Sequence, residues 1–351
     1  MIKAGIVGGT GYMGGEALRV LMDHPEVEIS WVTSRQKGDI SEFHPNLFGE
    51  KINLIHPDEA EACDVVFLAL PTDATIEAAS KFLDWQGKVI DLGAAFRLLD
   101  RAVWERIYGQ KHTQWSLAQN AVYGIPELHL EEIKQANLIA NPGCFASAAI
   151  LGLSPLVKED LVETDRIVVD GLSGTAGAGA ELSRAAHHPE IGNNLVPYNV
   201  VGHRHTFEME QELSLQSTDK VTVHFTPVYV PIIRGILDIC HCFPTKEMSR
   251  ETIIELYRDF YHDDPFVKIY DLPFEKTASW QYKPYPWVNS VAGTNYCYIG
   301  LDVDPDRGRI VVFSILDSIG KGGAQVGIEN MNLMFGLDRT LGLGRRGLHP
   351  G

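Results

Sequence analysis

The sequence predicts an α/β protein: a Rossmann-type, doubly wound parallel sheet plus a second α+β domain with a mostly antiparallel sheet. Over the first 140 residues, short apolar runs alternate with helical stretches, which is typical of parallel strands joined by crossover helices. From about Arg166 to Leu316 the strand-like runs lie closer together. One of these runs, 235–243, alternates its side chains with period two, as in antiparallel sheets.

The first domain is expected to contain five strands, at 3–7, 28–33, 64–70, 88–92 and 137–140. The segment 12–24 places its apolar residues on one helical face, and Pro25 ends that helix. A closing helix is expected at 324–335. Residues 1–143, completed by the C-terminal segment 324–351, are therefore predicted to form a nucleotide-binding domain.

The second domain is expected to contain strands at 166–172, 221–225, 235–243, 296–303 and 309–315. A helix at 145–156 precedes them, and another at 248–261 interrupts them. Residues 144–323 are therefore predicted to form the catalytic, substrate-binding and oligomerisation domain.

Composition excludes several classes of function. Hydrophobic residues make up 45% of the 351 residues and charged residues 22%, as in soluble globular proteins. No apolar run approaches the roughly 18 residues of a membrane span, and the first residues indicate a strand rather than a signal peptide. We therefore expect a cytoplasmic protein without membrane partners. The net charge of −16 argues against nucleic-acid binding, so an anionic substrate needs a locally basic pocket.

A glycine-rich loop follows the first strand, with glycines at positions 8, 11 and 14. A strand before this spacing and a helix after it are typical of dinucleotide sites, where backbone N–H groups approach a pyrophosphate. The second strand ends in Ser34 and Arg35 rather than in an acidic residue, which favours NADP over NAD. The alternatives are an ordinary glycine turn and a solvated Arg35.

Cys144 is the candidate nucleophile among five cysteines. An odd count without a C-x-x-C spacing argues against a disulfide framework and for a reducing compartment. Cys144 follows Asn141-Pro142-Gly143, a turn after the strand 137–140, and precedes the helix 145–156. A helix N-terminus stabilises a thiolate there. The alternative for any cysteine is core packing.

His203-Arg204-His205 is the candidate acid/base and anion-binding group. The alternatives are surface histidines near a turn or a metal site, since His-x-His is also a metal-ligand spacing. No further metal motif accompanies it, so no metal is expected.

Other groups suited to anions are a second glycine-rich loop at 171–179, Arg97 and Arg234. The loop either offers free backbone N–H groups to an anion or the cofactor, or is a flexible surface loop. Each arginine either clamps a substrate carboxylate or forms an ordinary surface ion pair.

Taken together, the motifs resemble the N-acetyl-γ-glutamyl-phosphate reductase family along essentially the whole chain. The shared segments include GIVGGTGYMGGEALRVL, DLGAAFRL, NPGCFAS, GLSGTAGAGA, HRHTFE, PIIRGIL and ENMNLMFGLD. The related aspartate-semialdehyde dehydrogenases and aminoadipyl-phosphate reductases share the fold and the chemistry.

The resemblance implies roles for individual residues. Cys144 would be the nucleophile and one of His203 and His205 the acid/base. The residues expected to bind the cofactor are Gly8, Thr10, Gly11, Tyr12, Gly14, Ser34, Arg35, Pro71, Gly174 and Asn330. Those expected to bind the substrate are Arg97, Asn141, Arg204 and Arg234. The chain departs from the family pattern at Thr72, Ala176, Ala180 and Phe207.

The implied reaction is the NADPH-dependent reduction of N-acetyl-γ-glutamyl phosphate to N-acetylglutamate 5-semialdehyde in arginine biosynthesis, through a Cys144 thioester. A homodimer or homotetramer is expected. The alternatives are a related reductase for an aminoadipyl or aspartyl phosphate, a metal-dependent hydrolase using His203 and His205, and a cofactor-binding regulatory protein without catalysis.

Overall fold

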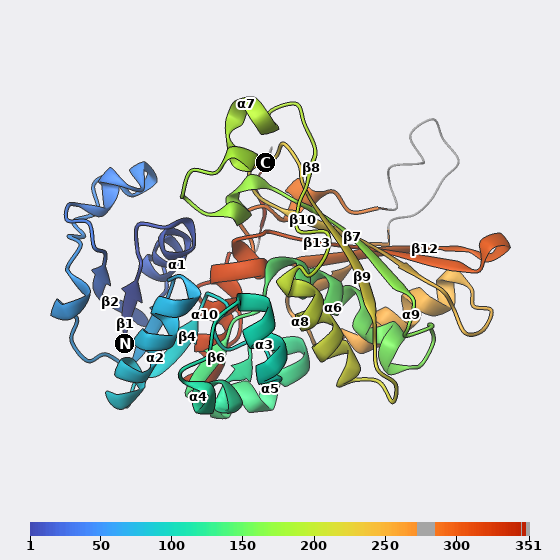
Figure 1. Ribbon diagram of the computed structural model, residues 1–351, viewed down its shortest axis with the longest axis horizontal. Coiled ribbons are helices and arrows are strands. Elements are labelled where there is room, and N and C mark those ends of the chain that lie inside the picture. The colour runs from blue at the N-terminus through green and yellow to red at the C-terminus, as the bar shows by residue number, and fades with distance from the viewer. Residues whose placement is uncertain (272–284, 345, 349–351) are drawn as a thin grey trace. The chain divides into compact units, whose positions relative to one another are not determined.

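The computed structural model describes residues 1–271, 285–344 and 346–348 (Figure 1). The chain forms two compact units, Met1–Pro142 with Gly323–Leu343, and Gly143–Gly322 with Gly344–Gly351. The predicted assignment of the whole segment 324–351 to the first domain is wrong at its end. In the second unit, the backbone N–H of Leu348 donates to the carbonyl oxygen of Ala292 at 3.2 Å.

The first unit contains a six-stranded sheet in the order β2-β1-β3-β4-β6-β5. Every described pair of neighbouring strands is parallel, which confirms the predicted Rossmann-type sheet. The strands are β1 (Ile2–Val7), β2 (Val27–Thr33), β3 (Val65–Leu68), β4 (Lys88–Asp91), β5 (Val122–Tyr123) and β6 (Leu138–Ala140). β3 is buried along its length because its four residues, VVFL, are all apolar.

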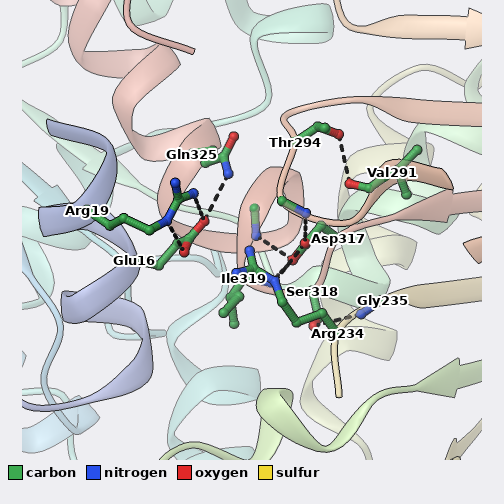
Figure 2. A network of polar contacts seen from close by, with 12 residues as sticks. Glu16, Arg19, Arg234, Gly235, Val291, Thr294, Asp317, Ser318, Ile319 and Gln325 are labelled. Atoms are coloured by element: carbon green, nitrogen blue, oxygen red, sulfur yellow. Dashed lines mark hydrogen bonds and ion pairs between the residues drawn. The ribbon is translucent and has the colours of Figure 1, made fainter. Parts of the chain in front are cut away.

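The helices of this unit are α1 (Tyr12–Met22), α2 (Thr72–Asp84), α3 (Arg101–Tyr108), α4 (Trp115–Asn120), α5 (Pro126–Gln135) and α10 (Gln325–Met334). α10 comes from the far end of the chain and is buried throughout. The buried carboxylate of Glu16 on α1 accepts hydrogen bonds from Gln325 Nε2 (2.9 Å) and Arg19 Nε (3.0 Å) (Figure 2). This contact ties the closing helix to the first one.

The second unit contains a seven-stranded mixed sheet in the order β11-β12-β13-β10-β7-β9-β8. The strands are β7 (Ile167–Ser173), β8 (Val196–Pro197), β9 (Val223–Tyr229), β10 (Ile236–Cys242), β11 (Val267–Ile269), β12 (Cys297–Asp304) and β13 (Arg309–Leu316). The pairs β7–β9 and β11–β12 are parallel, and the remaining described pairs are antiparallel. The predicted, mostly antiparallel second sheet is confirmed.

The helices of the second unit are α6 (Cys144–Lys158), α7 (His188–Ile191), α8 (Arg204–Ser214) and α9 (Arg250–Phe260). α6 packs on β10 and β13 and is almost wholly buried, because its sequence is apolar or small at nearly every position. Pro155 lies inside α6 and has no N–H to donate to Leu151, four residues earlier. The hydroxyl of Tyr261 donates to that carbonyl oxygen at 2.6 Å instead.

Tyr261→Phe is expected to lower the free energy of unfolding by about 1–3 kcal/mol, the cost of leaving a buried acceptor unpaired. Removal of the hydroxyl leaves the Leu151 carbonyl without its donor while the ring still fills the same volume. Urea unfolding followed by circular dichroism measures this loss, with Tyr270→Phe as the control for loss of a tyrosine hydroxyl. Equal stability of the two variants would contradict the assignment.

Candidate active site

Cys144 is the first residue of α6, directly after the N-cap Gly143. A Cβ atom at Gly143 would lie only 2.4 Å from Nε2 of His205, so glycine lets the imidazole pack against the chain beside the nucleophile. All five cysteines are among the described residues, and Cys144 alone is partly accessible. The other four are buried, so a reagent or substrate reaches Cys144 first.

Three of the four buried cysteines are poor nucleophiles. Burial raises the pKa of Cys63 to about 11 and that of Cys242 to about 12, and it raises the pKa of Cys240 well above its ordinary value. Their thiols therefore stay protonated at neutral pH, and the thiolate is the reactive form. These properties agree with core packing at the buried positions and favour Cys144 as the reactive cysteine.

His203 is the N-cap of α8. Its Nδ1 atom accepts a hydrogen bond from the backbone N–H of His205 at 3.2 Å. Burial, together with the neighbouring Arg204, lowers the pKa of His203 to about 4. The ring is therefore neutral at physiological pH, and because Nδ1 accepts, the proton is assigned to Nε2. The alternative of surface histidines near a turn is wrong, because both rings are buried and the pair begins a helix that the sequence did not predict.

His205 has an acidic neighbour that the sequence reasoning missed. Nε2 of His205 lies 4.0 Å from Oε1 of Glu208, whose carboxylate is buried. Oε2 of Glu208 accepts a hydrogen bond from the backbone N–H of Gly143 at 2.9 Å. Glu208 therefore connects the histidine to the residue before Cys144. The available signal was the spacing, since residues three apart on a helix share a face.

Aromatic side chains surround this group within the second unit. The ring of Phe145 lies 5.9 Å from that of His203 and 5.8 Å from that of His205, between centroids. Tyr198 and Tyr229 stack at 4.2 Å. Burial raises the pKa of both tyrosine hydroxyls; Cys144 adds to the rise and Arg204 opposes it. The two tyrosines, which the sequence did not single out, therefore lie within electrostatic range of both groups.

The four predicted substrate-binding residues have different surroundings. Arg204 is exposed at the start of α8, and its positive charge acts on Tyr198 and Tyr229. Arg234 forms an ion pair with Asp317 at 2.8 Å in the second unit. In the first unit, Nε of Arg97 donates to the carbonyl oxygen of Asn141 at 2.7 Å, and Nδ2 of Asn141 donates to that of Gly323 at 2.8 Å. These contacts order the main chain, and the predicted substrate roles stay predictions.

The first glycine loop has the shape of a phosphate cradle. Gly8 has a φ of +85°, and a Cβ there would lie 2.3 Å from the Ala69 carbonyl oxygen. A Cβ at Gly14 would lie 2.4 Å from the Gly8 carbonyl oxygen. At Gly11, the N-cap of α1, a Cβ would meet protein only at 3.7 Å. Gly8 and Gly14 therefore shape the loop, whereas Gly11 leaves room at a helix N-terminus, where anions bind.

The other predicted cofactor residues of the first unit lie around this loop or at element ends. Thr10 Oγ1 is 3.5 Å from Oγ of the buried Ser34, which brings the loop and the end of β2 together. Arg35 and Tyr12 are exposed, and Pro71 is the exposed N-cap of α2. Nδ2 of the buried Asn330 on α10 donates to the carbonyl oxygen of Gly124 at 3.0 Å. The loop and the end of β2 fit a dinucleotide.

The prediction that the second glycine loop offers free backbone N–H groups is wrong for Gly174–Gly177. The N–H of Gly174 donates to Gly235 (2.9 Å), that of Thr175 to Ile232 (3.0 Å) and that of Ala176 to Ile233 (2.9 Å). The N–H of Gly177 donates to Gly174 at 3.4 Å. These four N–H groups are therefore already hydrogen-bonded within the protein, and the cofactor role of Gly174 stays a prediction.

Gly11→Ala is expected to weaken NADPH binding by about ten-fold without lowering the melting temperature, because the methyl group occupies space at the phosphate-binding N-terminus. Gly14→Ala is expected to lower the melting temperature, because its methyl group meets backbone atoms. Fluorescence titration with NADPH and thermal unfolding measure the two effects. Wild-type affinity in a folded Gly11→Ala variant would show that the phosphates bind elsewhere.

The alternative of a metal site at the histidine pair needs further metal-binding side chains nearby. Among the described residues, no group of three or more His, Cys, Asp or Glu side chains is arranged to hold a metal ion. Likewise, none of the helices in the described part of the chain has the length and apolar character that crossing a bilayer requires.

Comparison with known proteins gives two family matches. Residues 3–136 match the family "Semialdehyde dehydrogenase, NAD binding domain", and residues 144–318 match "Semialdehyde dehydrogenase, dimerisation domain". Among solved structures, an aspartate semialdehyde dehydrogenase II from Vibrio cholerae covers 95% of this chain and 98% of its own, with a TM-score of 0.71 and 17% identity. At that identity the likeness shows the fold alone.

Curated relatives are much closer in sequence. A protein of Methanosphaera stadtmanae named "N-acetyl-gamma-glutamyl-phosphate reductase" is 42% identical over 353 residues, covering 99% of each chain. A protein of the same name from Clostridium beijerinckii is 41% identical, with 98% of each chain covered. Another from Methanocaldococcus jannaschii is also 41% identical, with 100% of each chain covered.

Proposed function

Because the chain belongs to the N-acetyl-γ-glutamyl-phosphate reductase family of oxidoreductases, we propose that it reduces N-acetyl-γ-glutamyl phosphate to N-acetylglutamate 5-semialdehyde with NADPH, in arginine biosynthesis. The observation that carries this proposal is the placement of the partly accessible Cys144 at the start of α6, with His205 and Glu208 beside it.

Cys144 provides the nucleophile. Its thiolate attacks the γ-carbonyl carbon of the acyl phosphate, a C–S bond forms, the C–O bond to phosphate breaks, and inorganic phosphate leaves. The N-terminus of α6, with its partial positive charge, stabilises the oxyanion that forms during the attack. Phosphate is a good leaving group and needs little help from an acid. The product of this step is a thioester on Cys144.

NADPH, which the glycine loop and Ser34 would hold in the first unit, would supply the hydride that reduces the thioester carbon. The C–S bond then breaks, the aldehyde leaves, and the sulfur needs a proton or an ion-pair partner. We assign this role to His205, because the buried carboxylate of Glu208 lies 4.0 Å from its Nε2 atom and can pair with a protonated ring. His203 is held neutral as a helix cap, so we assign it a structural role.

Arg204 is proposed to hold the phosphate or carboxylate of the substrate. It is exposed on the same helix as His205, and its charge acts on the tyrosine pair that also responds to Cys144. A guanidinium binds both anions through paired hydrogen bonds. The net charge of −16 means that an anionic substrate needs a locally basic site, and Arg204 would provide it.

NADP is proposed over NAD because Ser34 and Arg35 stand at the end of β2 where a carboxylate would bind the ribose of NAD. Thr10 and Ser34 bring this position next to the glycine loop. The match of residues 144–318 to a dimerisation domain supports a homo-oligomer. We further propose a cytoplasmic location, since the substrate belongs to amino-acid biosynthesis.

The decisive assay runs the reaction in the oxidative direction. Purified protein is mixed with N-acetylglutamate 5-semialdehyde, NADP⁺ and inorganic phosphate, and NADPH absorbance is followed. We expect a rise that requires phosphate and is faster than with NAD⁺. Parallel reactions with N-acetylaminoadipate semialdehyde and aspartate semialdehyde test the related substrates. Preference for either would replace the glutamyl assignment, and a rise independent of phosphate would contradict acyl-phosphate chemistry.

A further inference from the structure

Asp317 is a fully buried carboxylate in the turn that follows β13, outside the residues assigned above. Its Oδ1 atom accepts hydrogen bonds from the backbone N–H groups of Ile319 (3.0 Å) and Gly320 (2.9 Å). Its Oδ2 atom accepts from Nε of Arg234 (2.8 Å) and from the backbone N–H of Gly293 (Figure 2). One carboxylate therefore joins three segments of the second unit.

The turn held by Asp317 packs directly against the nucleophile. The backbone N–H of Gly322 donates to the carbonyl oxygen of Asp317 at 2.9 Å, and a Cβ at Gly322 would lie 2.7 Å from Cβ of Cys144. On its other side, a Cβ at Gly320 would lie 2.4 Å from the carbonyl oxygen of Thr294. The turn is thus enclosed between Thr294 and Cys144, so a displacement of the turn displaces the base of the nucleophilic side chain.

The turn is also connected to the second glycine loop. The N–H of Gly235 donates to Oγ of Ser318 at 3.2 Å (Figure 2). The carbonyl oxygens of Gly235 and Ile233 accept hydrogen bonds from the backbone N–H groups of Gly174 and Ala176, respectively. Continuous hydrogen bonds and van der Waals contacts therefore link the glycine loop, the Arg234 segment, the Asp317 turn and Cys144.

We propose that Asp317 is a positioning residue for Cys144, and that Arg234 acts through Asp317 rather than by contact with the substrate. The proposal rests on the proposed function, in which Cys144 is the nucleophile. A buried carboxylate that accepts a charged and several neutral hydrogen bonds fixes its donors firmly, and loss of its charge weakens its hold on the guanidinium of Arg234. The turn then holds the thiolate in the orientation that attack requires.

Asp317→Asn tests the proposal while preserving side-chain size. An amide NH₂ cannot accept the hydrogen bonds that one carboxylate oxygen accepts, so the turn loosens. We expect kcat to fall by about 10- to 100-fold, the typical cost of a small misplacement of reacting groups. KM for the acyl phosphate and for NADPH is expected to change by less than about three-fold, because binding groups are untouched. The pH profile of Cys144 alkylation by iodoacetamide is expected to shift, which a purely structural role would not cause.

Arg234→Gln provides the second test, with Arg250→Gln as its matched control. The side chain of Arg250 is 25% exposed against 23% for Arg234, and it forms its own ion pair with Asp271 at 3.0 Å in the same unit. We expect Arg234→Gln to reproduce the loss of kcat, the double variant with Asp317→Asn to fall no further, and Arg250→Gln to keep wild-type kcat. Gly322→Ala, which places a methyl group against Cys144, is expected to lower kcat in the same way even if Asp317→Asn does not fold.

The proposal is overturned if folded Asp317→Asn and Arg234→Gln keep wild-type kcat and alkylation profiles. It is also overturned if Arg234→Gln raises only the KM for the acyl phosphate, which would make Arg234 a substrate contact. Cys144→Ala separates these outcomes from failure of the proposed function. An inactive Cys144→Ala beside wild-type-like Asp317 variants removes this inference alone, whereas an active Cys144→Ala removes the proposed chemistry as well.

Discussion

Cys144→Ala is expected to lower kcat by more than about 1,000-fold while NADPH binding stays at the wild-type level, since loss of a covalent nucleophile removes the main route to the transition state. The cofactor loop belongs to the first unit and Cys144 to the second, so the substitution leaves the loop unchanged. Steady-state kinetics and NADPH fluorescence titration measure the two effects.

The matched control for this variant is Cys242→Ala. Cys242 is buried on β10 in the same unit, and burial raises the pKa of its thiol to about 12, so it takes no part in the chemistry. We expect its removal to leave kcat within a small factor of wild type. A Cys144→Ala variant with near-full turnover would show that the acyl group is never transferred to this sulfur.

His205→Asn is expected to lower kcat by about 100- to 10,000-fold, the range for removal of a general acid. The effect should lie in the step after thioester formation, because phosphate leaves without much help from an acid. Mass spectrometry of the variant mixed with acyl phosphate should therefore show the acyl group on Cys144. Rapid turnover of that acyl-enzyme by NADPH would argue against the assignment.

The comparison variant is His203→Asn, since asparagine is also a good helix N-cap. It can accept the N–H of His205 as the imidazole does, and we expect kcat to fall by less than about ten-fold because only a cap is exchanged. If the two variants exchange their effects, His203 is the acid/base and Glu208 supports the fold of α8.

The parts of the fold and site that could be predicted depend on local signals. A strand, a Pro-Gly turn and an apolar run are adjacent in sequence, and they placed Cys144 at the start of a helix, as found. The glycine loop after β1 was predictable for the same reason. The sequence also identified the histidine pair, but it gave no means of choosing between His203 and His205.

The features of the site that the sequence did not predict depend on contacts between residues far apart in the chain. Glu208 reaches the Gly143 backbone across 65 positions, and Arg234 meets Asp317 across 83. The spacing of residues along the chain does not reveal contacts over such separations. The sequence therefore could not decide whether Arg234 binds a substrate carboxylate or forms an ion pair within the protein. The two-residue strand β5 was missed because a strand that short has no alternation to detect. The end of the chain was misassigned because a short loop segment carries no signal for the unit it joins.

The burial of α10 in the first unit sets the order in which this chain reaches its native state during synthesis. Gln325 meets Glu16 across 309 positions, so the N-terminal unit has its sheet early but lacks one of its packing helices until residues 325–334 have been synthesised. The stretch Gly143–Gly322, which forms most of the other unit, is synthesised before α10, and Gly344–Gly351 join that unit afterwards. A nascent chain stalled before residue 323 therefore exposes an apolar face on the N-terminal unit, which is a target for chaperones and proteases.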